Sequence, residues 1–333
     1  MTAADERTEP LSPPAPPLVS VLMPAFNAGP FVAAAIRSIL SQTHSDLELL
    51  VADDLSSDQT REVVASLPDP RIRILHNDRH LGYLRTTNRL FELARGRYVT
   101  FQDADDLSEP IRLAEQVRAF QQEPGLGACG TWAQLIDARG GLLRVDEKPV
   151  APAEIRREMY VRNPFCGATM MVRMEALRAI GGYREGFEGL SHQDYDWACR
   201  LVERYAARNL PRPLYAYRQH GASNSKQISV GRAIGHLVVR ALAEERRQRG
   251  SDCLADGDSE AFAALVARLG APYVADPARL DREFAARFLW AGFPGWAIRR
   301  AWSALRKSPW HLRNYRLLVH CVRRLVLPTR PSA

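Results

Sequence analysis

Short apolar runs alternate with amphipathic stretches along the first half of this chain, and this pattern most constrains its fold. Four runs have the length and composition of buried strands, at residues 19–23, 47–52, 71–75 and 98–102. Amphipathic stretches that predict helices follow them, at 31–42, 58–67, 84–94 and from Ser108-Glu109-Pro110 onward. Strands and helices that alternate in this way form a mostly parallel central sheet with helices on both faces. We therefore predict an α/β fold.

The second half of the chain has a different pattern. From residue 125 to about 225 the sequence is irregular, and Gly140-Gly141 predicts the turn of a hairpin between residues 132–136 and 142–145. Further short strands are expected at 170–172 and 213–217. Beyond about residue 227 the pattern becomes helical, over 230–249 and 259–269, followed by several short basic segments. We place a boundary near residue 226.

The start of the chain is rich in proline and lacks the basic start and apolar run of a signal peptide. Residues 1–17 are therefore expected to form a disordered leader. No apolar stretch approaches the ~20 residues that span a bilayer. The five cysteines are scattered and suit a reducing compartment. These features predict a cytoplasmic protein.

Acidic residues follow two of the predicted strands. Asp53-Asp54 ends the second strand, and Asp103-Ala104-Asp105-Asp106 follows the fourth. The carboxyl ends of the strands are the edge at which open α/β sheets bind ligands. Each motif alone is also explained as a solvated turn that caps a helix. Two such motifs on one edge repel each other unless a cation or a donor-rich ligand offsets the repulsion. Carboxylates suit Mg²⁺ or Mn²⁺, which such sites share with substrate phosphates.

In their order and spacing these motifs resemble the family-2 inverting glycosyltransferases of the GT-A fold, over about residues 18–226. The segments that carry the resemblance are 19–27, 38–43, 53–58, Asn88, 96–98, 103–106, 181–183, 193–196 and 217–220. The resemblance implies a GT-A-type nucleotide-binding catalytic domain over 18–226. Its donor half would cover about 18–125 and its acceptor half about 126–226, and residues 227–333 would form a helical, basic C-terminal region.

The resemblance also implies an activity, which is transfer of a sugar from a nucleotide-diphosphate sugar to a hydroxyl group with inversion. The donor would be linked to UDP or dTDP. The acceptor would be a glycan or a lipid-linked saccharide, in the synthesis of cell-surface glycans or polysaccharides. Residues expected on the donor side are Pro24, Phe26 near the base, Asp54 as an acceptor for the base, Asn88, and Asp103 near the ribose.

The resemblance assigns the metal and the base to different parts of the chain. Asp105 would coordinate Mg²⁺ or Mn²⁺ at the diphosphate, and His220 would either complete this site or be a surface-loop histidine. Asp106 is expected to cap a helix. Asp194 would be the catalytic base, because inversion requires a carboxylate that takes the acceptor proton opposite the leaving group. Asp194 also stands at a predicted helix start, where acidic residues are favoured.

Other residues of the motifs have looser expectations. Arg218 and Lys226 are further candidates for the diphosphate, and the segments 163–167 and 181–183 are expected to frame the acceptor pocket. Two positions depart from the family pattern. Gln193 stands where glutamate usually precedes the base, and Leu55 stands where glycine usually follows the paired aspartates. Since leucine disfavours a positive φ, the backbone of this loop is expected to differ.

The positive charge of the chain lies in its tail. Residues 284–333 hold ten Lys and Arg side chains and no Asp or Glu, so this segment carries +10 and the remainder −3. It also holds Trp290, Trp296, Trp302 and Trp310. One interpretation is contact with an anionic membrane. The other, which we prefer from the sequence, is a helical subdomain with tryptophans packed inward and arginines in solvent. No nucleic-acid-binding motif accompanies the charge.

Two other functions are compatible with parts of this pattern. A sugar-nucleotide nucleotidyltransferase also uses an α/β nucleotide-binding domain, but the loop at residues 24–30 lacks the Lys or Arg that would handle a triphosphate. A non-catalytic scaffold that binds nucleotide sugars or membranes would not need both Asp105 and Asp194.

Overall fold

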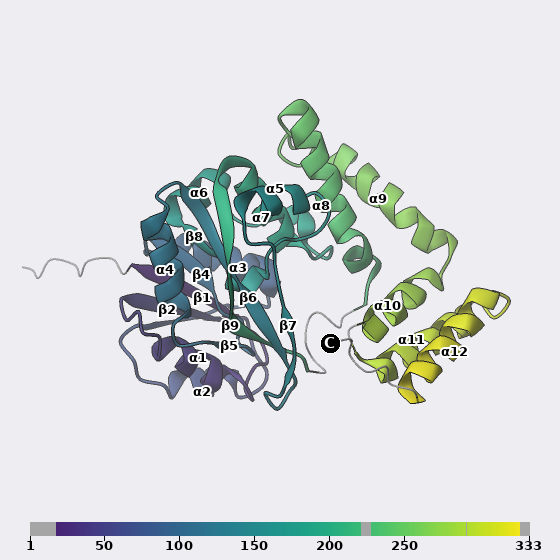
Figure 1. The fold of residues 1–333 in the computed structure, drawn as a ribbon, viewed down its shortest axis with the longest axis horizontal. Coiled ribbons are helices and arrows are strands. Elements are labelled where there is room, and N and C mark those ends of the chain that lie inside the picture. The colour runs from purple at the N-terminus through teal and green to yellow at the C-terminus, as the bar shows by residue number, and fades with distance from the viewer. Residues whose placement is uncertain (1–17, 221–227, 291, 327–333) are drawn as a thin grey trace, which may run out of the picture.

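The structure is a computed structural model that describes residues 18–220, 228–290 and 292–326. The expected leader at 1–17, the boundary near residue 226 and Lys226 lie outside the described residues. A nine-stranded sheet forms the centre, with helices on both of its faces (Figure 1). The strands lie in the order β3-β2-β1-β4-β8-β6-β9-β5, and β7 pairs with β6.

The elements follow one another as the alternating pattern predicts. The strands are β1 Val19–Ala25, β2 Leu47–Asp53, β3 Ile72–His76, β4 Tyr98–Phe101, β5 Leu107–Ser108, β6 Leu126–Ile136, β7 Leu142–Asp146, β8 Met171–Arg173 and β9 Ala206–Arg218. The helices are α1 Val32–Leu40, α2 Thr60–Ala65, α3 Gly82–Leu93, α4 Arg112–Gln122, α5 Pro152–Glu158, α6 Met174–Ile180, α7 Gln193–Arg204, α8 Val230–Arg249, α9 Ser259–Ala275, α10 Arg279–Trp290, α11 Pro294–Lys307 and α12 Leu312–Val326. Two short 3-10 helices occur at Gly167–Thr169 and Glu185–Phe187.

The first four strands of the sheet form its parallel half. β1 lies between β2 and β4 and is parallel to both, and β2 is parallel to β3. Alternate side chains enter opposite faces of the sheet. Val21 belongs to the core that includes α1, α2 and α4, whereas Leu22 belongs to the core that includes α3, α6 and α7. Both faces are therefore buried, which explains why these strands read as continuous apolar runs.

The rest of the sheet is mixed. β8 is antiparallel to both of its neighbours, β4 and β6. β6 is parallel to β9. β5 pairs antiparallel with β9, and β7 pairs antiparallel with β6. The predicted α/β architecture with helices on both faces and a C-terminal helical extension is confirmed. The parallel pairing that we predicted from the alternating pattern is concentrated in the first half of the chain.

Two local expectations were wrong. A helix was expected from Ser108-Glu109-Pro110, but Leu107–Ser108 is the short strand β5, and α4 begins at Arg112. The reason is a long-range pairing with β9, which continues when the Glu109 N–H donates to the carbonyl of Leu214. β9 is also much longer than the expected 213–217. Pro211 and Pro213 lie within it, where the register with β6 shifts, because proline has no N–H for the ladder.

The apolar core continues from the sheet into the C-terminal helices. An aromatic cluster of Phe91, Phe101, Tyr183 and Trp197 fills one face, with ring centroids 5.4 to 6.4 Å apart. The same buried cluster includes side chains of α8, α10 and α11. Figure 1 shows α8 to α12 as an arm that leaves the sheet and ends in α10, α11 and α12.

The tail differs from the arrangement that we preferred from the sequence. Trp290, Trp302 and Trp310 are exposed rather than packed inward, and Trp296 alone among the four is partly buried against the core. Among the helices that the structure describes, none is both long and apolar enough to cross a bilayer. The cysteines at 129, 166, 199, 253 and 321 are free.

Candidate active site

The acidic loop after β4 brings together the two residues predicted to hold a metal. The Asp105 carboxylate Oδ2 lies 2.7 Å from Nε2 of His220, and both side chains are partly buried. The end of β9 holds this loop in place, because the Arg218 Nε donates to the Asp105 carbonyl at 2.8 Å. His220 is thus positioned at the acidic loop rather than on a separate surface loop.

Asp103 lies deeper in the same loop. Its main-chain N–H donates to the hydroxyl of Tyr215 at 3.0 Å, and its Oδ1 lies 3.4 Å from the hydroxyl of Tyr83. Burial raises the pKa of Asp103 to about 7, and the charges of Asp105 and Asp194 add to this rise. Asp194 is 91 residues further along the chain in α7, and its charge nevertheless acts on Asp103.

Asp106 does not cap a helix, contrary to our expectation. Its Oδ1 accepts a hydrogen bond from the Arg218 N–H at 2.6 Å, and α4 begins only at Arg112. The side chain is buried, and burial, together with the charges of Asp103 and Asp105, raises the pKa of Asp106 well above its usual range. Asp106 therefore joins the acidic loop to the end of β9, the element that also delivers His220.

The donor set at this loop fits a divalent cation that a substrate helps to bind. Within the described ranges, no cluster of three or more His, Cys, Asp or Glu side chains has the geometry of a complete metal site. Asp105 and His220 supply a carboxylate oxygen and an imidazole nitrogen next to each other. Mg²⁺ and Mn²⁺ are commonly held by one or two carboxylates together with substrate phosphates and water. Asp105 and His220 would provide this smaller share of the ligands.

Asp194 is the second residue of α7, directly after a strained turn. Ser191 and His192 adopt positive φ values of 59° and 67° and turn the chain into the helix. The Asp194 Oδ2 accepts a hydrogen bond from the Asn163 side-chain amide at 3.2 Å. A Cβ atom on Gly167 would lie 2.6 Å from the same oxygen. The carboxylate is therefore held between the start of α7 and the segment 163–167, one of the two segments that we expected to frame the acceptor pocket.

The start of α8 packs directly on the turn that precedes Asp194. A Cβ atom on Gly231 would lie 2.2 Å from the carbonyl oxygen of Gly189, and one on Gly235 would lie 2.4 Å from that of Leu190. Only glycine allows this approach of helix backbone to turn backbone. Arg232 lies on the same turn of α8. Burial raises the pKa of Asp194, and the charge of Arg232 acts in the opposite direction.

Asp54 anchors the start of α3. Its Oδ1 accepts from the Asn77 side-chain amide at 2.7 Å and from the Leu81 N–H at 2.8 Å, and its Oδ2 accepts from the Gly82 N–H at 2.8 Å. The carboxylate thus satisfies two main-chain donors at the first turn of the helix, which the helix itself leaves without partners. Asp54 is buried.

An exposed aromatic platform lies next to Asp54. The rings of Phe26 and His80 are 4.3 Å apart and tilted by 41°, and Phe26 is 48% exposed. The His80 Nδ1 lies 3.1 Å from the Asp54 Oδ2. Pro24 lies two residues before Phe26, near the end of β1, where it pairs with Ala52 of β2. The two predicted base-side residues, Phe26 and Asp54, are therefore linked through His80.

Asn88 has partners within the protein. Its side-chain amide donates to the carbonyl of Tyr183 and accepts from the Tyr183 N–H, both at 2.8 Å. Burial raises the pKa of Tyr183 well above its usual range, and the charges of Asp194 and Asp103 raise it further. Asn88 therefore fixes the main chain of Tyr183, whose ring packs in the aromatic cluster.

Comparison with known proteins identifies the family. Residues 20–181 match the model of glycosyl transferase family 2. EpsE of Bacillus subtilis (strain 168), to which glycosyltransferase activity is ascribed, is 32% identical over 213 residues, which are 61% of this chain and 73% of EpsE. The chain belongs to glycosyltransferase family 2.

Another relative of this family-2 glycosyltransferase has a more specific name. WfgD of Escherichia coli is a UDP-Glc:α-D-GlcNAc-diphosphoundecaprenol β-1,3-glucosyltransferase. It is 41% identical over 100 residues, which cover 30% of this chain and 40% of WfgD.

Solved structures confirm the GT-A-like fold of this glycosyltransferase. TarS from S. aureus, in complex with UDP-GlcNAc, superposes with a TM-score of 0.57 at 18% identity, covering 92% of this chain and 91% of that chain. A mannosyltransferase from Pyrobaculum calidifontis, in complex with GDP-Man and Mn²⁺, has a TM-score of 0.52 at 19% identity, covering 95% of this chain and 82% of the other.

The glycosyltransferase keeps a left-handed backbone at Leu55 in spite of the missing glycine. Leu55 has a φ of 62° and is exposed. Leucine disfavours this conformation, and the hydrogen bonds on both sides of Leu55 hold the loop, while the expected difference from the family's loop stays a prediction. The Asp54 N–H donates to the Ala25 carbonyl, and Ser56 and Ser57 are hydrogen-bonded to Asn27.

Sequence reasoning missed three residues near the site. Tyr83 and Tyr215 contact Asp103, and His80 contacts Asp54. Burial raises the pKa of Tyr83 well above its usual range, and the charges of Asp103 and Asp194 contribute to the rise. None of the three belongs to the motifs that carried the resemblance. Its position could have indicated Tyr83, because this residue stands at the predicted start of a helix, at the edge of the sheet where the acidic residues were expected.

Proposed function

We propose that this glycosyltransferase transfers a sugar from a UDP- or dTDP-linked donor to a hydroxyl group with inversion. One observation carries the proposal. Asp103 and Asp105 lie in the donor half of the catalytic region and Asp194 in the acceptor half, and the charges of Asp103 and Asp194 act on each other and on the partly buried Tyr83, whose hydroxyl lies 3.4 Å from Asp103. The names of WfgD and of the TarS complex include UDP-linked sugars, which supports a uridine nucleotide.

The donor nucleotide would lie along the carboxyl edge of the parallel strands. The exposed ring of Phe26, beside Pro24, would stack on the base, and Asp54 would accept the N–H of uracil or thymine. The oxygens of Asp54 already bind three strong donors, so the base would displace His80, its most exposed partner. Asp103 would approach the ribose, and Asn88 would act by holding Tyr183.

Asp105 and His220 would hold Mg²⁺ or Mn²⁺ at the donor diphosphate. A divalent cation at this position neutralises the charge that develops on the leaving diphosphate. The solved mannosyltransferase contains Mn²⁺, which supports a divalent ion in this fold. Arg218 keeps the loop in place from β9, because its main chain binds Asp106 and its side chain binds the Asp105 carbonyl.

Asp194 would take the proton of the acceptor hydroxyl as its oxygen attacks the sugar. General-base catalysis of this type contributes about 10²–10⁴-fold. Asn163 donates to one carboxylate oxygen, and Gly167 leaves room for it, so the carboxylate has a fixed orientation. The charge of Arg232 favours its ionised form, although Gln193 provides no such charge.

The acceptor belongs in our proposal to the glycans or lipid-linked saccharides of cell-surface polysaccharide synthesis. The acceptor in the name of WfgD is linked to diphosphoundecaprenol, which supports the lipid-linked class. We propose that the enzyme acts from the cytoplasm, with residues 18–226 as the catalytic domain. Because the chain belongs to glycosyltransferase family 2, we no longer propose the nucleotidyltransferase activity. Asp105 and Asp194 are both present, which argues against a non-catalytic scaffold.

Two variants test the separate roles of the metal residue and the base. Asp105→Ala should lose Mn²⁺-dependent binding of UDP, measured by calorimetry. Asp194→Asn should keep this binding and lose transfer by about 10²–10⁴-fold. A hydrolysis screen of UDP-, dTDP- and GDP-linked sugars with Mg²⁺ and Mn²⁺ would identify the donor without knowledge of the acceptor. Full transfer by Asp194→Asn, or tight UDP binding without a divalent ion, would contradict the assignments.

The pH profile gives a second readout for Asp194. A base acts only when deprotonated, so activity is present above its pKa and is lost as the pH falls through it. Because burial raises the pKa of Asp194, we expect this loss at a higher pH than for an ordinary aspartate. This loss of activity at low pH should be absent from the pH profile of the residual activity of Asp194→Asn. If the residual activity of Asp194→Asn falls over the same pH range, a group other than Asp194 causes the loss.

A further inference from the structure

The last helix of the arm presents an apolar stripe to solvent. Leu312, Tyr315, Val319 and Val322 are spaced by three or four residues along α12 and are 42% to 71% exposed. The other side of α12, with Asn314, Leu317, Leu318 and Cys321, is buried or partly buried where the helix packs on α10 and α11. The stripe is therefore not used to pack the arm itself.

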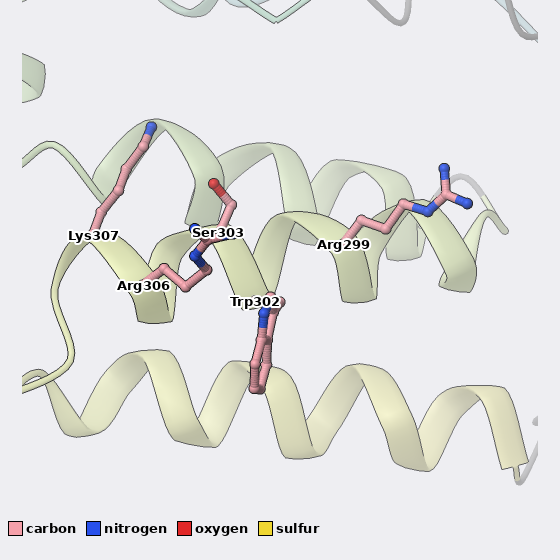
Figure 2. Close-up of a pocket in the computed structure, with 5 residues that line it drawn as sticks. All are labelled: Arg299, Trp302, Ser303, Arg306 and Lys307. Atoms are coloured by element: carbon pink, nitrogen blue, oxygen red, sulfur yellow. The ribbon is translucent and has the colours of Figure 1, made fainter.

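Exposed tryptophans add to this surface. Trp302 on α11 is 55% exposed, and Trp310, in the turn between α11 and α12, is 95% exposed. In Figure 2 the ring of Trp302 points from α11 toward α12. Amphipathic aromatic rings of this kind concentrate at the boundary between lipid headgroups and acyl chains.

Positive charge surrounds the apolar side chains. Arg313, Arg316 and Arg323 of α12 are exposed, and residues 284–333 contain no acidic side chain. On α11, a shallow cavity of about 390 Å³ is lined by Arg299, Trp302, Ser303, Arg306 and Lys307 (Figure 2). Lys307 and Ser303 contact Asp281 of α10, whereas Arg299 and Arg306 lie at the exposed side of the cavity. The surface thus combines apolar side chains with cations.

We infer that this surface of α11 and α12 docks on an anionic phospholipid bilayer. A bilayer offers both kinds of partner, since the acyl boundary accepts the stripe and the headgroup phosphates accept the arginines. A second copy of the chain would bring the same positive charge to the interface, which opposes self-association. A nucleic acid would pair with the arginines but would leave the apolar stripe in water.

This inference goes beyond the proposed transfer and does not depend on it. In this proposal the C-terminal helices attach the catalytic region to the membrane. If the proposed lipid-linked acceptor is correct, docking would hold the enzyme on the surface that carries its substrate.

The test is cosedimentation of the full chain with vesicles, in the absence of any nucleotide sugar. We expect the protein to pellet with vesicles of equimolar phosphatidylcholine and phosphatidylglycerol, to bind vesicles of phosphatidylcholine alone far more weakly, and to be released by salt. The double variant Val319→Glu with Val322→Glu places charge in the stripe and should abolish binding. Ile74→Glu is the matched control, because Ile74 is 41% exposed on β3, the edge strand of the central sheet, and this variant should bind like the wild type.

A second variant keeps the stripe and removes charge. Arg316→Gln with Arg323→Gln should weaken binding by about five-fold per arginine. Wild-type failure to bind anionic vesicles, or undiminished binding by the Val319/Val322 variant, would overturn the proposal. If light scattering shows that the wild type is a dimer and the Val319/Val322 variant a monomer, a second copy of the chain covers this surface instead of a bilayer. Because no sugar donor is present, either failure leaves the proposed transfer untouched.

Discussion

At the scale of single residues, the orientation of the Asp194 carboxylate depends on the absence of a side chain at residue 167. A Cβ at this position would lie 2.6 Å from the Asp194 Oδ2, inside van der Waals contact. We expect Gly167→Ala to move the carboxylate and to lower kcat by about 100-fold, because a displacement near 1 Å has effects of this size. Steady-state kinetics with the identified donor would measure the change.

The control for this prediction is Gly125→Ala. A Cβ on Gly125 meets nothing within 4 Å, so this variant should keep wild-type kcat. Equal kinetics of Gly167→Ala and wild type would show that the carboxylate is free to adjust.

Leu55 is a residue at which this chain carries backbone strain. A left-handed conformation costs an L-residue about 1–2 kcal/mol, whereas glycine adopts it freely. Relief of this strain is partly offset because glycine loses more conformational entropy on folding. We therefore expect Leu55→Gly to raise the free energy of unfolding by up to about 1 kcal/mol and to leave activity unchanged. Leu142→Gly, at an exposed leucine of the extended strand β7, should lower stability instead. Thermal unfolding of both variants would decide, and a loss of stability in Leu55→Gly would contradict the strain.

At the scale of elements, α8 acts as a support for the turn that carries the base. Alanine favours helix over glycine by about 1 kcal/mol, so Gly235→Ala would stabilise an isolated α8. In the protein its Cβ would lie 2.4 Å from the Leu190 carbonyl oxygen, and we expect a net loss of stability together with a lower kcat. UDP binding should remain, because the donor side lies on other elements.

Gly270→Ala is the matched comparison for this variant. Gly270 lies inside α9, where a Cβ would meet its nearest neighbour at 3.9 Å, an ordinary contact. This variant should keep its activity and gain up to about 1 kcal/mol. If Gly235→Ala behaved like Gly270→Ala, α8 would not position the base.

At the scale of the whole molecule, a buried ionic network joins the catalytic region to the C-terminal helices. Asp196 on α7 is fully buried and pairs with Arg184 and Arg200, and Arg184 pairs in turn with Asp252, which follows α8. Arg246 of α8 binds both Asp252 and Glu203 of α7. We propose that residues 18–220 and α8 fold as one cooperative unit in spite of the predicted domain boundary.

Removal of one charge from this network tests that proposal. Asp196→Asn should lower the free energy of unfolding by about 3–5 kcal/mol, because it removes the carboxylate that pairs with the buried Arg200 and leaves Arg184 with Asp252 alone. Asp256→Asn, which alters an exposed pair with Arg249, should have an effect below about 1 kcal/mol. Denaturant unfolding followed by two probes would show one coincident transition in the wild type, and two separate transitions would contradict a single unit.

The sequence by itself determined the elements of the parallel half and the edge at which the carboxylates gather. Both depend on local periodicity and on acidic residues directly after apolar runs, which neighbouring residues along the chain reveal. The tertiary structure alone decided that Asp106 ties β9 to the acidic loop, that prolines lie within β9, and that α8 packs on the turn before Asp194. It also decided that Trp302 and Trp310 lie in solvent. These features depend on contacts between residues far apart in sequence, whose energies have no signature in the local pattern.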